Sequence, residues 1–209
     1  MISDTTTTQL QGIAPLPHLG IIRAAGSDAA SFLHNQLTND VLLMKEGQSR
    51  LAAFCNAKGR MQASFVVYKR SAEEVLLICR KDLIAQTVKR LSMFVLRAKA
   101  KLSDASEEFQ MLGLAGDAAL AALNGASTDA WQRHAVGTAD VLTLYPALGQ
   151  PRAFFIALKD EAAPTGPAMS ADLWQMGEVM SEYLARRMAD FVQKRKVRPD
   201  RKRRQLPRD

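Results

Sequence analysis

Residues 50–70 read RLAAFCNAKGRMQASFVVYKR, and this stretch decides the fold class. Two runs that combine apolar and β-branched residues flank the short sequence NAKG, residues 56–59. Asn tolerates left-handed backbone geometry and Gly supplies a positive φ, so NAKG is a turn sequence. The stretch therefore predicts a β-hairpin with its tip at NAKG.

Strands and helices alternate around this hairpin. A helix is expected after residue 26, with Ser27 as its N-cap and its end near Asn39–Asp40, because Phe32, Leu33 and Leu37 recur at helical spacing. Asn39 and Asp40 then cap the helix end and start the next turn, while Gln36 and Thr38 serve the fold. The remaining elements expected before residue 105 are strands over 18–26, 73–80 and 96–104 and an amphipathic helix over 81–95.

A second cycle of similar make-up follows. Strands are expected over 109–116, 140–146 and 152–158, a short helix over 116–125 that Gly125 closes, and one helix over 170–195 after a Pro/Gly linker. Two such cycles predict an α+β protein of ferredoxin-like antiparallel sheets with packed helices. The expected divisions are a flexible lead-in (1–17), a first α+β subdomain (18–105), a second (106–181) and a basic C-terminal helix or tail (182–209).

The charge of the chain is concentrated at its end. The sequence has 28 basic and 21 acidic residues, a net charge of +7. Residues 182–209 hold eleven of the basic and four of the acidic residues, so this segment carries the whole excess and residues 1–181 are neutral. A nucleic-acid-binding domain usually has basic residues clustered on its folded part too. The high pI therefore describes the last 28 residues, and the body of the chain has no basic excess.

Composition also bears on compartment and cofactors. No apolar run reaches the ~20 residues that span a bilayer, and residues 1–20 have no secretory signal pattern. The two cysteines, Cys55 and Cys79, form no CxxC pair, and the three histidines are scattered. We expect a cytoplasmic protein with free thiols, no metal site and no membrane partner; a disulfide would require the two cysteines to face each other on neighbouring strands.

Three blocks carry a family resemblance: FLHNQLTNDV (32–41), the hairpin stretch, and LSMFVLRAKAKLSD (91–104). In this order they resemble the N-terminal part of the folate-binding YgfZ family, which is related in fold to the glycine cleavage T-protein, an aminomethyltransferase. The resemblance covers residues 19–181. It implies a tetrahydrofolate site in a central opening between three subdomains, support of iron–sulfur cluster enzymes, including those that modify tRNA, and no strong catalytic activity.

The T-protein motif N-x-x-G-G-x-x-D-D can be compared residue by residue. Asn56 and Gly59 match its Asn and first Gly, and Arg60 replaces the second Gly. One of the two acids contacts folate and assists the transfer, and Ala63 and Ser64 stand in their places. Neither side chain holds a negative charge near a developing iminium, which argues against aminomethyl transfer and against an enzyme.

The same comparison implies the candidate cofactor-binding residues Asn56, Lys58, Gly59 and Arg60. Lys58 and Arg60 would meet the glutamate tail of tetrahydrofolate by charge pairing. In the alternative interpretation, Asn56 and Gly59 only turn the chain and the two cations are solvated. No catalytic residue is assigned.

The resemblance stops near residue 182. Trp174 and its helix lie where the family has a tryptophan-containing helix, but the family motif K-G-C-x-x-G-Q-E is absent from the sequence. Three interpretations of residues 182–209 stay open: an out-of-frame end, a short family member with its own C-terminal helix, or a nucleic-acid-binding arm. A chain that ends at Asp209 would be a truncated form with an incomplete folate site, reduced function and exposed apolar surface that favours self-association.

The predicted function is tetrahydrofolate binding in support of iron–sulfur cluster assembly or repair and iron–sulfur-dependent tRNA modification. The expected partners are a folate and iron–sulfur cluster proteins. One alternative is an aminomethyltransferase. The other is an RNA-binding adaptor that makes weak RNA contacts through its basic tail.

Overall fold

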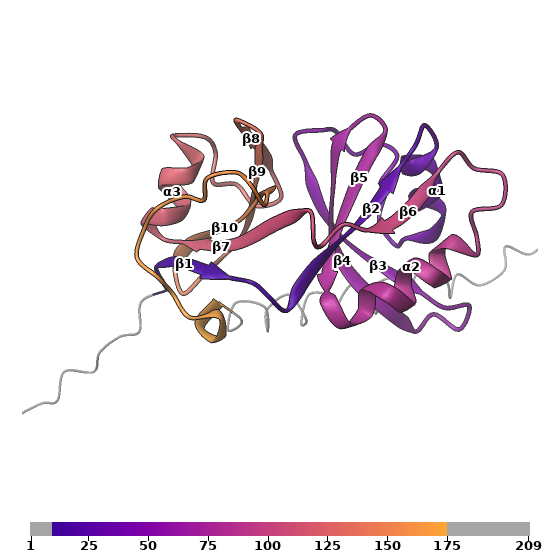
Figure 1. Ribbon diagram of the computed structural model, residues 1–209, viewed down its shortest axis with the longest axis horizontal. Helices are drawn as coiled ribbons and strands as arrows, with labels where there is room; N and C mark the ends of the chain where they lie inside the picture. Colours follow the sequence, from indigo (N-terminus) through magenta and orange to yellow (C-terminus); the bar gives the residue numbers. More distant parts are fainter. Residues whose placement is uncertain (1–9, 175–209) are drawn as a thin grey trace, which may run out of the picture.

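The structure is a computed structural model that describes residues 10–174. Two five-stranded antiparallel sheets form its two subdomains (Figure 1). The first sheet has the order β3-β4-β5-β2-β6 and the second the order β1-β7-β10-β9-β8. The strands of the first sheet are β2 (Leu19–Ala25), β3 (Ser49–Cys55), β4 (Met61–Ser71), β5 (Glu74–Arg80) and β6 (Lys101–Asp104). Those of the second are β1 (Gly12–Pro15), β7 (Phe109–Ala115), β8 (Arg133–Val136), β9 (Ala139–Ala147) and β10 (Gln150–Leu158).

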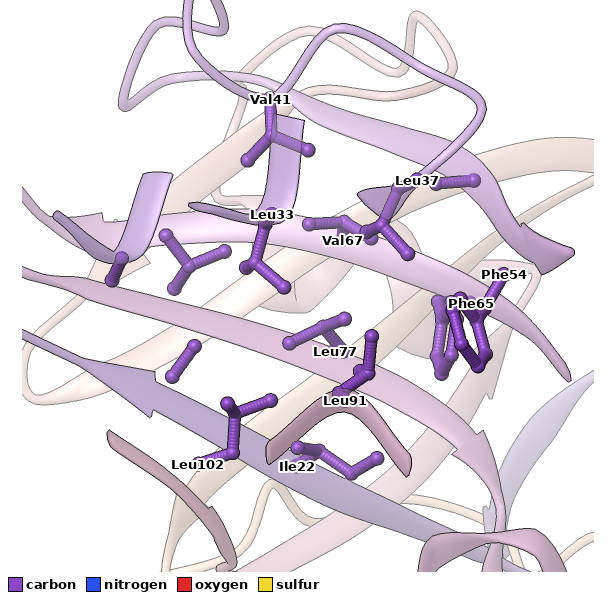
Figure 2. Close-up of a cluster of buried hydrophobic side chains, with 14 of the residues drawn as sticks. Ile22, Leu33, Leu37, Val41, Phe54, Phe65, Val67, Leu77, Leu91 and Leu102 are labelled. Carbon is purple, nitrogen blue, oxygen red and sulfur yellow. The ribbon is translucent and has the colours of Figure 1, made fainter. Parts of the chain in front are cut away.

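Helices cover the outer faces of both sheets. Helices α1 (Ala29–Gln36) and α2 (Ile84–Ser92), the latter preceded by the 3₁₀ turn η1 (Lys81–Leu83), pack on the first sheet. Figure 2 shows Leu33 of α1 and Leu91 of α2 directed at Val67 and Leu77 of this sheet. Helix α3 (Asp117–Leu123) packs on the second sheet.

A third core lies between the two sheets. It joins Ile21, Tyr68 and Ile78 of the first sheet to Leu142 and Phe154 of the second. The protein is therefore layered as helices, sheet, sheet and helix, and both sheets are buried on two faces. This explains the almost continuous apolar character of β5 and β9, where strict alternation would mark one solvated face.

The architecture predicted from sequence is confirmed: an α+β protein of antiparallel sheets with packed helices. The 50–70 hairpin is present as β3 and β4. Helix α1, however, begins after Asp28 and ends at Gln36, so the Ser27 cap and the end near Asn39–Asp40 were wrong. The helix stops early because the next residues pair with β3: Leu37 bridges Phe54, and Thr38 exchanges hydrogen bonds with Ala53.

The strand predicted over 96–104 is shorter than expected, since only Lys101–Asp104 form β6. The backbone at Lys99 instead bonds to the start of α1: its N–H donates to the Asp28 carboxylate at 2.7 Å, and its carbonyl accepts from the Asp28 N–H at 3.1 Å. These bonds satisfy the polar groups of the segment without a strand partner.

The N-terminal lead-in also differs from the prediction. Within the expected flexible segment 1–17, residues 12–15 form β1, which pairs with β7 of the second sheet. Leu10, Ala14 and Leu16 are buried in the core between the sheets. The second subdomain is thus built from two separate parts of the chain. The helix predicted over 170–195 lies for the most part outside the described residues, as does the tail 182–209.

Candidate functional site

The turn of the β3–β4 hairpin is held by one side chain. The Asn56 Oδ1 atom accepts hydrogen bonds from the N–H groups of Lys58 and Arg60, each at 3.0 Å. The Asn56 backbone donates to the Arg60 carbonyl at 2.9 Å, and Gly59 has a φ of 76°. Asn56 and Gly59 therefore shape the turn, which agrees with the interpretation that gave them a structural role.

The two predicted cations lie at the tip of this hairpin. Lys58 and Arg60 are both exposed, and within residues 10–174 neither side chain has an ion-pair or hydrogen-bond partner. Their charges are available to an anionic ligand. The four predicted site residues, which are near neighbours in the sequence, all lie in this turn or directly beside it.

The two positions aligned with the T-protein acids face opposite sides of the first sheet. Ala63 is 2% exposed and packs in the core beneath the helices. Ser64 is exposed and stands opposite Ala53, on the same face as the pairs Leu51–Val66 and Ser49–Tyr68. That face is the one turned toward the second sheet. Of the two positions, only Ser64 has an exposed side chain, and it lies on this inner face.

A cavity of about 430 Å³ lies on this inner face, between the two subdomains. We call it the inter-sheet cavity. One wall comes from the start of β3 and the other from the segment before β8 and from β9; the lining residues are Asn39, Gln48, Ser49, Arg50, Leu51, Trp131, Gln132 and Tyr145.

The inter-sheet cavity contains an unpaired polar atom and an aromatic pair. The Ser49 Oγ atom is buried and has no hydrogen-bond partner among the described residues. The rings of Trp131 and Tyr145 meet edge to face, with centroids 5.2 Å apart and planes at 86°. Trp131 has a φ of 70°, a conformation that costs about 1–3 kcal/mol for a residue other than Gly and is found at ligand-binding sites.

A second cavity, of about 610 Å³, lies at the ends of α1 and α2 beside the hairpin. We call it the helix-end cavity. Its lining residues are Asn35, Gln36, Leu37, Thr38, Phe54, Cys55, Asn56, Ala57, Arg90, Met93 and Phe94. Arg90 donates to the Gln62 Oε1 atom at 2.6 Å and so is held toward the hairpin. The two cavities share no lining residue.

The two cysteines do not face each other. Cys55 and Cys79 lie on β3 and β5, which are separated by β4, and they form no disulfide. Burial raises the pKa of the Cys79 thiol to about 12, which keeps it protonated. Within residues 10–174 no three metal-ligating side chains gather, and none of the helices is long and apolar enough to cross a membrane.

Sequence reasoning missed the residues of the inter-sheet cavity. Ser49, Trp131 and Tyr145 come from distant positions, and no local motif marks them. The available signal was weak: Trp131 is one of two tryptophans in the sequence and lies in a polar stretch between predicted elements.

The comparisons with known proteins agree with the resemblance found in the sequence. Three relatives align with about half of this chain. An uncharacterized protein of Haemophilus influenzae is 30% identical over 97 residues, 46% of this chain and 34% of its own. The tRNA-modifying protein YgfZ of Hamiltonella defensa is 33% identical over 100 residues, 48% of this chain and 29% of its own. An aminomethyltransferase of Bacillus licheniformis is 30% identical over 112 residues, 54% of this chain and 30% of its own.

The matched region thus spans about a third of the length of these relatives. Among solved structures, the glycine cleavage system aminomethyltransferase T from Bartonella henselae has a TM-score of 0.61 at 16% identity. The match covers 72% of this chain and 43% of that one, and it establishes a shared fold. A family described as the GCVT N-terminal domain matches residues 5–146. Because this match takes in more than half of the chain, the protein belongs to the GCVT N-terminal domain family.

Proposed function

We propose that this chain binds tetrahydrofolate on the inner face of its first sheet, with the inter-sheet cavity as the main part of the site. The observation that carries the proposal is a cavity on the face to which Ser64 belongs, lined by Ser49, whose buried hydroxyl has no partner among the described residues. A buried hydroxyl without a partner is costly, and a bound ligand with a polar edge removes that cost.

The cavity has the chemistry that a pterin requires. A pterin is a flat heteroaromatic ring with hydrogen-bond donors and acceptors along its edge. Trp131 and Tyr145 offer aromatic surface, and the Ser49 hydroxyl and the amides of Gln48 and Gln132 offer hydrogen bonds. These groups would hold the ring and set its orientation.

The glutamate end of the folate would lie toward the hairpin tip. β3 runs from the cavity at Leu51 to the turn after Cys55, a distance of roughly 13 Å at about 3.3 Å per residue. A folate extended along this strand would bring its carboxylates toward Lys58 and Arg60, whose charges are unpaired within the described residues. The four predicted site residues would then position and bind the tail.

Aminomethyl transfer is not part of the proposed function. A carboxylate at the Ser64 position would contact the folate and stabilise the cationic intermediate, and a serine there supplies no charge. We propose instead a role in iron–sulfur cluster assembly or repair that supports tRNA modification. Support for this role comes from the similarity to a relative named tRNA-modifying protein YgfZ. The aminomethyltransferase alternative rests on similarity to proteins of that name.

Isothermal titration of the full chain with tetrahydrofolate tests the proposal. We expect Tyr145→Ala and the double variant Lys58→Ala/Arg60→Ala to weaken binding several-fold. The matched controls are Leu148→Ala, which removes an exposed side chain near Tyr145, and Lys45→Ala, which removes an exposed charge in the loop before β3. Absence of any binding heat would overturn folate binding by this chain. Binding that the site variants leave unchanged would overturn the location.

A further inference from the structure

Charges are segregated within the neutral body of this protein. The three segments that line the helix-end cavity lie in long stretches without a carboxylate: residues 29–39, 47–72 and 83–103 contain no Asp or Glu. The same stretches carry exposed cations, which are Lys58, Arg60, Lys89, Arg90, Arg97, Lys99 and Lys101. The positive excess of the sequence lies in the tail, but the fold also gathers cations at this end of the first subdomain.

Apolar side chains project from the same region. Met93 is 69%, Phe94 54% and Leu96 87% exposed. They belong to the segment between α2 and β6, residues 93–100, which Figure 1 shows at the outer end of the first subdomain, away from the second sheet. One carboxylate, that of Asp28, lies against this segment at the Lys99 N–H, and the other charged side chains of the segment and of the stretches around it are cations. Exposed apolar side chains flanked by cations mark a binding surface.

The cavity beside this segment is lined by groups that can recognise a base. Asn35, Gln36, Asn56 and Phe94 are among its lining residues, and the amide oxygen of Asn56 is already engaged in the hairpin turn. Amides pair with the edges of nucleobases, and an exposed phenyl ring can stack on a base face. Arg90, which also lines the cavity, offers a planar guanidinium that suits a phosphate or a base.

We propose that the helix-end cavity and the 93–100 segment form a binding site for a single-stranded polynucleotide. One base would enter the cavity against Phe94, and the adjoining phosphates would lie along the cations from Arg90 to Lys101. The helix-end cavity shares no lining residue with the inter-sheet cavity, although Asn56 at its edge also belongs to the hairpin turn that we propose to hold the folate tail.

An anionic lipid surface would be attracted to the same cations and exposed apolar side chains. Acyl chains, however, form no hydrogen bonds with the three amide-bearing residues that line the cavity. The amide lining therefore favours bases over acyl chains, and vesicle binding becomes one outcome of the test.

The first experiment measures the binding of a fluorescein-labelled oligouridylate to the full chain by anisotropy, from about 50 to 200 mM salt. We expect Phe94→Ala to weaken binding roughly fivefold or more, the lower end of what one stacked base contributes. Leu120→Ala, which removes an exposed apolar side chain on α3, should have no effect. Arg97→Glu should lower the slope of log K against log salt by about 0.7 or more per lost phosphate contact, and Lys45→Glu should not.

Photo-crosslinking separates this site from the basic tail. An oligouridylate with one 4-thiouridine should crosslink to residues 89–101 or to the cavity lining, as located by mass spectrometry. Crosslinks confined to residues 182–209, together with wild-type affinity of Phe94→Ala and Arg97→Glu, would overturn the proposal.

Two further outcomes would also overturn it. One is displacement of the oligouridylate by uridine monophosphate at equal concentration, since the site would then hold a free nucleotide. The other is co-sedimentation with phosphatidylglycerol vesicles that Phe94→Ala abolishes while leaving oligouridylate binding intact. Thermal unfolding of each variant shows whether a loss of binding reflects a loss of fold.

Discussion

The Tyr68 hydroxyl donates a hydrogen bond to the Asp140 Oδ2 atom at 3.2 Å, and this contact links β4 of the first sheet to β9 of the second. Asp140 is 3% exposed and is also bound by Arg133, whose Nη2 atom lies 2.7 Å from Oδ1, while the Arg70 Nε atom lies 3.6 Å from Oδ2. Burial, followed by the nearby Asp140 charge, raises the pKa of Tyr68 well above its usual value. The phenol thus stays a hydrogen-bond donor, and the two subdomains share one buried polar network.

Removing the carboxylate from this network should destabilise the protein strongly. Asp140→Ala leaves Arg133 and Arg70 without their shared counter-charge, and we expect a loss of about 3 kcal/mol, the low end for a broken buried pair because both guanidiniums keep some solvent contact. Tyr68→Phe removes one hydrogen bond and should cost about 1 kcal/mol. Urea unfolding measures both. Equal losses for the two variants would contradict the central role of Asp140.

A methyl group at position 113 should disturb the packing of Trp174. A Cβ on Gly113 would lie 2.5 Å from the Trp174 ring, which is fully buried and stands over Arg152 with 5.0 Å between the guanidinium carbon and the ring centre. We expect Gly113→Ala to lower stability by about 1–3 kcal/mol and to shift tryptophan emission to the red. Gly47→Ala is the matched control, since a Cβ at Gly47 meets no atom within 4 Å. If Gly113→Ala changed neither the unfolding free energy nor the tryptophan emission, the packing of Trp174 against Gly113 would be contradicted.

The buried Cys79 thiol should make stability depend on alkaline pH. Its pKa is raised to about 12 in the folded protein from 9.0, chiefly by burial, so the unfolded chain releases this proton first as the pH rises. Stability should therefore fall between pH 9 and 12, and the fall should be shallower in Cys79→Ala than in wild type. Denaturant titrations at several pH values test this. Identical slopes for the two proteins would show that Cys79 does not contribute.

The hairpin turn should respond to changes at Asn56 and Gly59. Asn56→Ala deletes the acceptor for two backbone N–H groups. Gly59→Ala places a residue with a side chain at a φ of 76°, so its backbone is strained although no atom lies within 4 Å of the new Cβ. Each should cost about 1 kcal/mol of unfolding free energy. Lys58→Ala changes neither feature and should be neutral. If Asn56→Ala left the unfolding free energy unchanged, Asn56 would not stabilise the turn, and ligand binding would be the role left for it.

Local sequence patterns predict the hairpin and most of the helices and strands, but they do not predict the contacts between these elements. NAKG specifies a turn within four residues, so the β3–β4 pair could be predicted from sequence. β1 and β8 have only four residues each, and β1 ends at a proline, so no periodicity marks them. Helix α1 ends where it does because Leu37 pairs with Phe54, a contact that the pattern of α1 itself does not contain.

The candidate site also has one part that the sequence predicts and one part that it does not. Lys58 and Arg60 lie beside a recognisable turn and could be proposed from the sequence. Ser49 and Trp131 meet only because the edge of β3 packs against the segment before β8, where the Ser49 N–H donates to the Trp131 carbonyl at 2.9 Å. Their joint role follows from the arrangement of the two sheets and from no motif.

The pairing of β1 with β7 has a consequence for synthesis of the chain. Gly12 is made early, yet its partner in the ladder is Ala115. At about 5–20 residues per second, the intervening chain takes on the order of 5–20 s to be translated. During that interval the first sheet can assemble on the ribosome while the apolar N-terminal strand waits without its partner. A chaperone that shields nascent chains could bind this strand during that interval. The strand would be exposed to aggregation until β7 leaves the exit tunnel and pairs with it.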